Sequence, residues 1–164
     1  MITAIDILKN ITKEVSNELF MKINFHHGHT LTVVNLITEL KKSGKKAYPA
    51  VIVFTEGIIE KRDKYYFEFT IPKIAICTLT KLNASDEQRL ESTFKDIIYP
   101  IFENLQKKLQ IINVGYDLSL TRTDIPFFLQ LDNKNTFNQL VDGCIIKNLK
   151  MKVMYEQCKL SVKF

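Results

Sequence analysis

The sequence predicts an α+β fold in which two or three helices pack on a mainly antiparallel sheet of four or five strands. Three observations lead to this prediction. Apolar residues recur at helical spacing near the N-terminus and again over residues 85–109, and strand-like runs occupy residues 48–54 and 65–79. A last alternating run covers residues 144–153. The predicted order is α-α-β-β-α-β-β, and strands that follow one another in pairs favour antiparallel neighbours over βαβ units.

Length and composition indicate one soluble domain that spans residues 1–164. Apolar residues make up 46% of the 164-residue chain, which is enough for a hydrophobic core, and the net charge is +5. Asp6 and Lys9 interrupt the N-terminal apolar pattern, which argues against a signal peptide, and no apolar run approaches the roughly 20 residues of a membrane span. Three cysteines without a Cys-x-x-Cys pair indicate buried free thiols, so we expect a cytosolic protein that does not bind membranes.

Two helices are predicted before the first strand. Residues 3–21 place apolar side chains at steps of three and four, which defines one face of a helix. Residues 24–29 break this helix, and residues 31–42 form a second one that Thr30 caps and Ser43-Gly44 ends. β-Branched residues keep a strand open as the alternative for this second segment. The apolar face of the first helix consists of Ile5, Leu8, Ile11, Val15, Leu19 and Phe20.

The next two predicted strands differ in their patterns. Residues 48–54 are continuously apolar, which is typical of a central strand buried on both faces, and residues 57–63 form a charged loop. Residues 65–79 alternate but contain Pro72. One bent strand and a short edge strand followed by a core strand are both compatible with that proline.

Residues 85–109 form the central helix of the prediction. Ser85 and Gln88 are spaced as a capping box, in which each side chain bonds the backbone N–H of the other residue. Pro100 predicts a kink, yet the apolar stripe stays in phase across it, so we predict one helix rather than two. The stripe consists of Leu90, Phe94, Ile97, Ile98, Ile101, Phe102, Leu105 and Leu109.

The C-terminal third predicts two more strands. Residues 111–120 alternate loosely, and residues 125–129 are strongly apolar. Residues 144–153 end in a clear alternation, which directs Lys150 and Lys152 to solvent.

No catalytic, cofactor-binding or metal-binding residues are predicted. His26, His27 and His29 lie close together but lack the partner residues and spacing of a zinc site. The sequence contains neither a glycine-rich phosphate loop nor a nucleophile elbow. Asp86 and Glu87 are explained by the dipole of the helix that they begin. The sequence therefore favours a protein without enzymatic activity.

Two kinds of residue are candidates for contacts with partners. Lysine clusters suit DNA or an acidic protein surface, although solvated lysine faces are common. They contain Lys41, Lys42, Lys45, Lys46, Lys150 and Lys152. An apolar segment after the loosely alternating run either closes the core or faces a neighbouring subunit. Its residues are Ile125, Phe127, Phe128 and Leu129.

Two groups of residues together resemble a known class of proteins. The first group joins Lys46-Ala47-Tyr48-Pro49, Glu87-Gln88-Arg89 and Phe94-x-x-Ile97-x-Tyr99-Pro100-Ile101. The second joins Asn135-x-Phe137-Asn138, Val141-Asp142-Gly143 and Ile145-Ile146-x-Asn148-Leu149-x-Met151. Over roughly residues 25–153, this pattern resembles the tail-terminator, tail-completion or head–tail connector proteins of phages and prophages of gut anaerobes.

The resemblance implies a non-enzymatic virion subunit with an α+β fold. It implies assembly in the host cytoplasm into a six-fold or twelve-fold ring of identical subunits around the DNA channel, at the head–tail joint or the tail end. The implied partners are tail tube, connector or portal proteins and DNA, which is contacted without sequence specificity. Residues 1–22 and 155–164 lie outside the pattern and are candidate inter-subunit arms. A cytosolic nucleic-acid-binding protein that uses the lysine clusters is the alternative.

Overall fold

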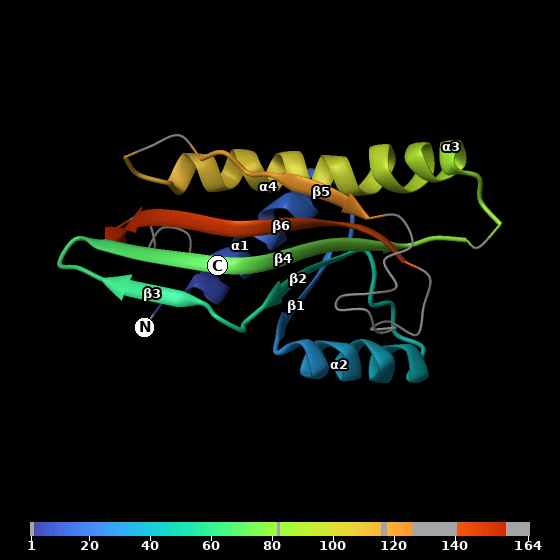
Figure 1. Ribbon diagram of the computed structural model, residues 1–164, viewed down its shortest axis with the longest axis horizontal. Coiled ribbons are helices and arrows are strands. Elements are labelled where there is room, and N and C mark those ends of the chain that lie inside the picture. Colours follow the sequence, from blue (N-terminus) through green and yellow to red (C-terminus); the bar gives the residue numbers. More distant parts are fainter. Residues whose placement is uncertain (1, 82, 116–117, 126–140, 157–164) are drawn as a thin grey trace.

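The helices and strands form three layers, with the sheet between a layer of two helices and a single shorter helix (Figure 1). The computed structural model describes residues 2–81, 83–115, 118–125 and 141–156. The α+β class is therefore confirmed. In chain order the elements are α1 (Ala4–Glu18), β1 (Asn24–Gly28), α2 (Thr30–Lys42), β2 (Ala50–Phe54), β3 (Ile59–Arg62), β4 (Tyr66–Leu79), α3 (Asp86–Arg89), the π-helix η1 (Leu90–Ile98), α4 (Tyr99–Ile112), β5 (Arg122–Ile125) and β6 (Val141–Met154).

The described strands form one mixed sheet of six strands in the order β1-β2-β4-β6-β5, with β3 also paired to β4. β1 and β2 are parallel, and the other neighbours are antiparallel. β4 and β6, with 14 residues each, pair along nearly their whole length and form the centre of the sheet. The predicted count of four or five strands and the predicted order α-α-β-β-α-β-β are therefore only partly right.

Two strands lie in stretches that the sequence assigned to a helix break and to a loop. β1 contains two histidines and pairs with β2 from Asn24 opposite Ala50 to Gly28 opposite Phe54. β3 is exposed at all four of its positions and forms a hairpin with β4. Neither strand shows the apolar alternation of a half-buried strand. Backbone pairing with β2 and β4, rather than burial of their own side chains, makes these segments strands.

The predicted strand over residues 111–120 is wrong. α4 continues to Ile112, and the described residues between α4 and β5 form no strand. The N–H of Leu118 donates to Oε1 of Gln110 at 3.0 Å, and the Leu118 side chain is buried in the same core cluster as α1 and α4. The apolar residues of this segment therefore cover the end of the helix layer instead of one face of a strand.

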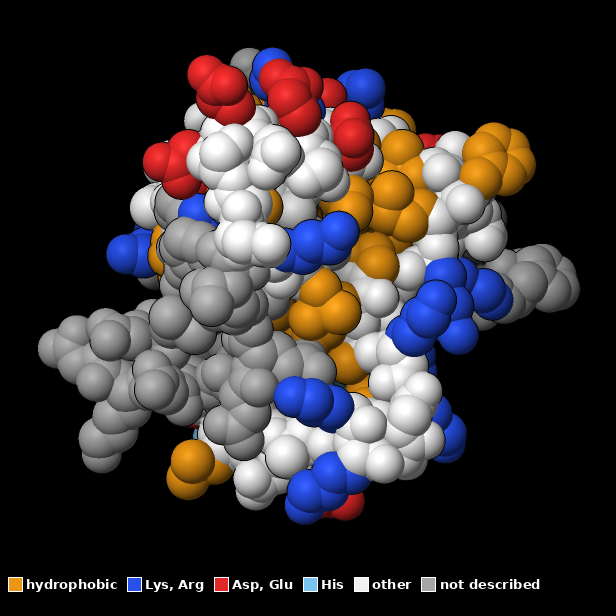
Figure 2. Space-filling model, turned by 90° about the vertical axis from the view of Figure 1, so that its right-hand side faces the viewer, with side chains coloured by type: hydrophobic (Ala, Val, Ile, Leu, Met, Phe, Trp, Pro, Cys, Tyr) orange, Lys and Arg blue, Asp and Glu red, His pale blue; other side chains and the backbone are white. Residues whose placement is uncertain are grey.

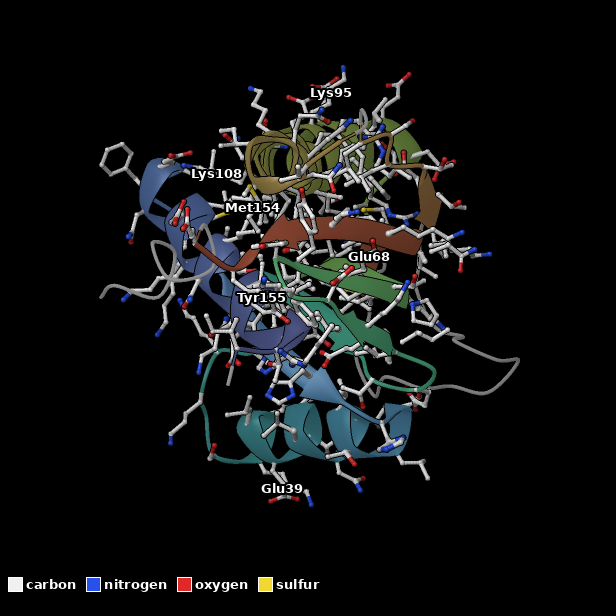
Figure 3. All side chains as sticks on the ribbon, turned by 90° about the vertical axis from the view of Figure 1, so that its left-hand side faces the viewer. Glu39, Glu68, Lys95, Lys108, Met154 and Tyr155 are labelled. Carbon is white, nitrogen blue, oxygen red and sulfur yellow. The ribbon has the colours of Figure 1, made fainter. Side chains whose placement is uncertain are left out.

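One face of the sheet, the closed face, is covered by α1 and by the continuous helix α3–η1–α4. Ser85 and Gln88 form the capping box that the sequence predicted. Nζ of Lys108 on α4 lies 3.2 Å from Oε2 of Glu14, and Figure 3 shows Lys108 beside α1. The large side chains fully buried on this face are Ile7, Leu8, Phe67, Ile71, Ile76, Ile98, Ile101, Leu105, Leu109 and Ile146.

The long helix of the closed face changes its hydrogen-bond spacing in the middle. η1 is a π-helix, in which N–H groups bond carbonyls five residues earlier, as the N–H of Tyr99 does to the carbonyl of Phe94. Pro100 follows directly and stands in the first turn of α4. The prediction of one continuous helix is confirmed, whereas the apolar stripe carries no sign of the change to π spacing.

The opposite face of the sheet is covered by α2 over only part of its area. Val33 and Ile37 pack α2 against β2 and the adjoining ends of β4 and β6, so the prediction of a helix over residues 31–42 is confirmed. In Figure 1, α1 lies behind the left half of the long strands, and no described helix lies in front of them. This uncovered area, the open sheet face, consists of Ile59, Lys61, Tyr66, Glu68, Thr70, Lys73, Lys147, Lys150 and Lys152.

β4 and β6 shift their alternation at the same level of the sheet. Ile71 and Ile74 are three residues apart in β4, yet both lie in the core of the closed face, with Pro72 between them. Their pairing partners in β6 are also three residues apart and in the same core. Asn148 lies between these partners and adopts a left-handed backbone with φ of 52°, which asparagine tolerates better than most residues. Each strand thus contains one extra residue, and the register between the strands is kept.

Candidate functional site

The open sheet face collects positive charge from three strands. Lys61 of β3 lies opposite Glu68 of β4, and Glu68 lies opposite Lys152 of β6. In the next row, Lys150 lies opposite Thr70. Directly opposite residues of antiparallel strands share a face of the sheet. Counted over the described residues, the open sheet face therefore carries five lysines and one glutamate.

Two of these lysines are oriented by neighbouring groups. Nζ of Lys152 lies 3.2 Å from Oε1 of Glu68. Nζ of Lys73 lies 5.0 Å from the centre of the Phe54 ring, which places Lys73 on the α2 side of the sheet. Its pairing partner Lys147 is exposed on the same side, so this ammonium group faces solvent.

A depression of about 500 Å³ lies on the open sheet face. Its apolar part includes Ile59, which is 65% exposed, and Val114, which follows α4. The N–H of Val114 donates to the carbonyl of Lys152 at 2.8 Å, so this segment borders β6. Ammonium groups around an apolar floor suit carboxylates or phosphates carried by a larger partner, because lysine contacts anions as a point charge.

The second lysine cluster of the sequence lies elsewhere on the molecule. Lys41, Lys42, Lys45 and Lys46 are all exposed at the C-terminal end of α2 and in the turn after it. Lys42 pairs with Glu39 at 3.0 Å, and cations at this position also complement the helix dipole. In Figure 1 this end of α2 points right, whereas β6 runs left towards its end. The structure therefore does not bring the two predicted clusters together.

The start of the long helix carries the opposite charge. Its exposed carboxylates form what we call the acidic helix face, which consists of Asp86, Glu87, Glu91 and Asp96. Lys95 contacts Glu91 and is the only lysine within this segment. Figure 2 shows acidic side chains gathered at the top of the molecule, at the end where α3 lies.

A buried ion pair lies beneath the acidic helix face. Nε of Arg89 donates to Oδ2 of Asp142 at 3.2 Å, and Nη2 donates to Oδ1. Oγ1 of Thr93 donates to Oδ2 of the same carboxylate at 2.9 Å. The Arg89 and Asp142 side chains are 3% and 0% exposed. A two-pronged contact of this kind fixes the geometry of both groups, so it ties the start of the long helix to the start of β6.

Sequence reasoning did not identify this ion pair. The signal for it is weak, because Asp142 is a lone acid before an apolar strand and Arg89 is one residue before the apolar stripe. Charged residues are almost never fully buried without a partner, so an acid at a strand position buried on both sides implies a cation. Only the fold shows which cation it is.

A smaller polar cluster connects the same helix to the edge strand β5. Oη of Tyr99 donates to Oδ2 of Asp124 at 2.8 Å, and Nε of Arg122 lies 3.0 Å from Oδ1. The Arg122 guanidinium stacks over the Tyr99 ring at 3.7 Å. Desolvation and the hydrogen bond to Asp124 raise the pKa of Tyr99. A pocket of about 350 Å³ lies between this cluster and Arg89, with Leu90 and Phe94 in its mostly apolar wall.

One histidine and two thiols take buried structural positions. His26 is buried, and its Nε2 donates to the carbonyl of Ala47 at 3.3 Å, while burial lowers its pKa. Cys77 and Cys144 are buried free thiols, as predicted. Burial raises the pKa of both thiols, to about 12 for Cys144. Within the described ranges, no group of three or more His, Cys, Asp or Glu residues is close enough to hold a metal ion.

The predicted apolar contact segment is only partly visible. Ile125 ends β5 and is half-buried against the cluster beneath α2. Phe127, Phe128 and Leu129 lie outside the described residues, so their contact with a neighbour stays a prediction. Other large apolar side chains are exposed near the acidic helix face, namely Leu79 at 51% and Leu90 at 41%.

Comparison with known proteins assigns no family to the chain. No protein-family model matches it, and no curated protein matches it. Among the described helices, none combines the length and the apolar composition needed to cross a lipid bilayer.

Proposed function

We propose that the chain is a non-enzymatic structural subunit of a phage virion, which assembles with copies of itself into a ring at the head–tail joint or the tail end. The observation that carries this proposal is the open sheet face, because no described helix covers this part of the sheet. Sheets in α+β domains are covered by helices on at least one face, and an uncovered charged face is a natural contact surface for a large partner.

The resemblance to tail and neck proteins supports the same proposal. Its two halves contain Arg89 and Asp142, which meet in the buried ion pair. Two residues of the pattern that are 53 positions apart in sequence thus have a direct physical connection. The pattern accordingly describes how this fold is held together, in keeping with a structural rather than a catalytic role.

The proposal implies a set of partners and a place. The subunit assembles in the host cytoplasm into a six-fold or twelve-fold ring and becomes part of the virion. Neighbouring tail tube, connector or portal proteins contact its outer surfaces, and DNA passes through its channel without sequence-specific contacts. Residues 1–22 and 155–164 remain candidate arms between subunits, although α1 buries one of its sides in the core of its own subunit.

The test is whether the purified chain forms rings and is found in particles. We expect native mass spectrometry to give six or twelve copies, electron microscopy to show closed rings, and mass spectrometry of purified phage particles to detect the chain. A chain that stays monomeric in solution and is missing from the particles contradicts the proposal.

A nucleic-acid-binding protein is the second candidate, because the open sheet face presents five lysines over the described strands. It predicts DNA binding that weakens steeply with salt, with each lost phosphate contact lowering the slope of log affinity against log salt by about 0.9. Lys147→Ala with Lys150→Ala should lower that slope by about twice this amount. Lys41→Ala with Lys42→Ala serves as the matched control elsewhere on the surface. An unchanged slope in the Lys147 and Lys150 variant contradicts binding through this face.

A further inference from the structure

We propose that neighbouring copies of the chain contact each other head to tail, with the acidic helix face of one copy lying against the open sheet face of the next. The occupant of the open sheet face is thus a second copy of this chain. This inference rests on the proposed ring function and adds to it which two surfaces meet.

The charges of the two surfaces are complementary. The acidic helix face has four carboxylates against Lys95, which leaves an excess of three negative charges. Arg89 and the buried Asp142 together carry no net charge, so they leave this excess unchanged, although Nη1 of Arg89 also lies 3.4 Å from Oδ1 of Asp86. The open sheet face has five lysines against Glu68, which leaves an excess of four positive charges. Opposite potentials of similar size favour encounter in one orientation and disfavour contact between like surfaces.

The two surfaces cannot meet within one copy. The acidic helix face lies on the outer side of the helices that cover the closed face, and the open sheet face lies on the other side of the sheet. A copy that uses one surface therefore leaves the other free for a further copy. Such heterologous contacts form a closed ring when the rotation between neighbours closes, and a filament when it does not.

Exposed apolar side chains stand next to both charged surfaces. Leu79 and Leu90 lie beside the acidic helix face, where Figure 2 shows a strip of hydrophobic side chains below the acidic groups. On the other surface, Ile59 belongs to the open sheet face, and Tyr65 precedes β4 with 60% of its surface exposed. Stable interfaces have an apolar centre with a polar rim, so each surface offers both parts.

Charge reversal tests the contact. The sheet variant carries Lys61→Glu, Lys147→Glu and Lys150→Glu, and the helix variant carries Glu87→Lys and Glu91→Lys. Each variant alone then presents two surfaces of the same sign, so we expect its self-association to weaken by roughly tenfold or more. In an equal mixture of the two variants, every contact between unlike copies joins surfaces of opposite charge, so association should be restored. The combined variant, which carries all the reversals in one chain, should associate again for the same reason. Analytical ultracentrifugation measures the self-association of each sample.

A matched control separates this effect from a general change in charge. The control carries Lys41→Glu, Lys42→Glu and Lys45→Glu, which reverse three exposed lysines at the end of α2 and in the turn after it, and it should leave self-association unchanged. Raising the salt concentration should weaken the wild-type contact, because exposed charges are screened over about 8 Å at physiological ionic strength.

The outcomes distinguish this contact from the proposed ring itself. If the wild type assembles and both reversed variants assemble equally well, the proposed ring is still supported, but the proposed contact between the two surfaces is wrong. If the wild type remains monomeric at every accessible concentration and salt, both proposals fail. If the sheet variant assembles normally but loses DNA binding, the open sheet face binds nucleic acid, and the proposed contact between copies is wrong.

Discussion

The two faces of the sheet are built in different ways. The closed face is covered by α1 and by α3–η1–α4, and it contains most of the fully buried large side chains. Among the described helices, only α2 covers the other face, which ends in a lysine-rich surface. β4 and β6 contribute to both faces. The same two strands thus carry the main hydrophobic core on one side and a charged surface on the other.

This division follows from the residues on each side. On the closed face, Phe67, Phe69 and Ile71 alternate with residues that point to the other side. Those other residues, such as Glu68 and Thr70, are polar and half-exposed. Burying apolar area stabilises the fold by roughly 25 cal/mol per Å², so the closed face supplies most of the folding free energy. Substitutions should therefore have very different effects on the two sides.

The largest effect is expected where a charge is left buried without its partner. Arg89→Ala leaves Asp142 with an exposed fraction of 0% and no guanidinium, which should lower the unfolding free energy by about 3–5 kcal/mol. Urea unfolding followed by circular dichroism measures this loss of unfolding free energy. Replacing both residues, as Arg89→Met with Asp142→Leu, should recover most of the loss, because no buried charge remains. A single variant as stable as the wild type would show that the pair is hydrated and not buried.

A smaller effect should separate the two faces directly. Ile101→Ala removes a fully buried side chain from the closed face and should cost about 2–5 kcal/mol of unfolding free energy. Ile37→Ala under α2 should fall at the low end of that range or below, because the thin layer can relax into the space. Leu36→Ala, at a position on α2 that is 42% exposed, is the control and should change stability by less than about 0.5 kcal/mol. Equal losses for Ile101 and Ile37 would contradict the difference between the faces.

The strand pair shared by both faces allows a third test. A Cβ added at Gly143 would lie 2.8 Å from the carbonyl oxygen of Ile76 and 3.1 Å from Sγ of Cys77. Gly143→Ala should therefore force β4 and β6 apart and lower the unfolding free energy by about 1–3 kcal/mol in the same urea experiment. Adding Cys77→Ala should not restore stability, because the backbone oxygen remains. Full recovery in this double variant would place the clash at the sulfur instead.

The smallest effect concerns pH and the side of the sheet under α2. His26 is paired with Ile52, which belongs to the cluster under α2, and burial lowers the pKa of His26. Below the unfolded-state pKa of about 6.5 the unfolded chain binds a proton that the folded chain does not. The unfolding free energy therefore falls as pH decreases through this value and is fully present above it. Stability measured between about pH 5 and pH 8 should vary less in His26→Asn, whereas His27→Asn, at an exposed position, should behave like the wild type.

The sequence predicted the parts of the fold that show regular periodicity. The stripe through Ile98 and Leu105, the cap at Ser85 and the alternation after Lys147 all lie where the pattern placed them. β1 and β3 were missed because their side chains are polar or exposed and only their backbones pair. The strand predicted over residues 111–120 failed because a short run of apolar residues fits a helix end as well as a strand.

The candidate site was predicted only in part for related reasons. Lys150 and Lys152 were expected to face solvent, and they do so on the open sheet face. Lys61 joins them because β3 pairs with β4, and Lys73 joins them because the alternation of β4 shifts at Pro72. Neither the pairing of β3 with β4 nor the shift in β4 can be read from the local periodicity of the sequence. The acidic helix face was visible as residues, but its relation to the lysines depends on the layers of the fold.

The extra residues Pro72 and Asn148 limit which deletions β4 and β6 can accept. Losing Pro72 alone would give β4 plain alternation with Ile71 and Ile74 still on the closed face, but Asn148 of β6 would have no residue opposite it. The strand pair would then contain a bulge, or its pairing would slip by one residue. Losing Asn148 alone would in the same way leave Pro72 of β4 without a residue opposite it. Losing both would restore plain alternation and keep the pairing between the strands. Deletions at these two positions, 76 residues apart by their numbers, should therefore disturb the sheet least when they occur together.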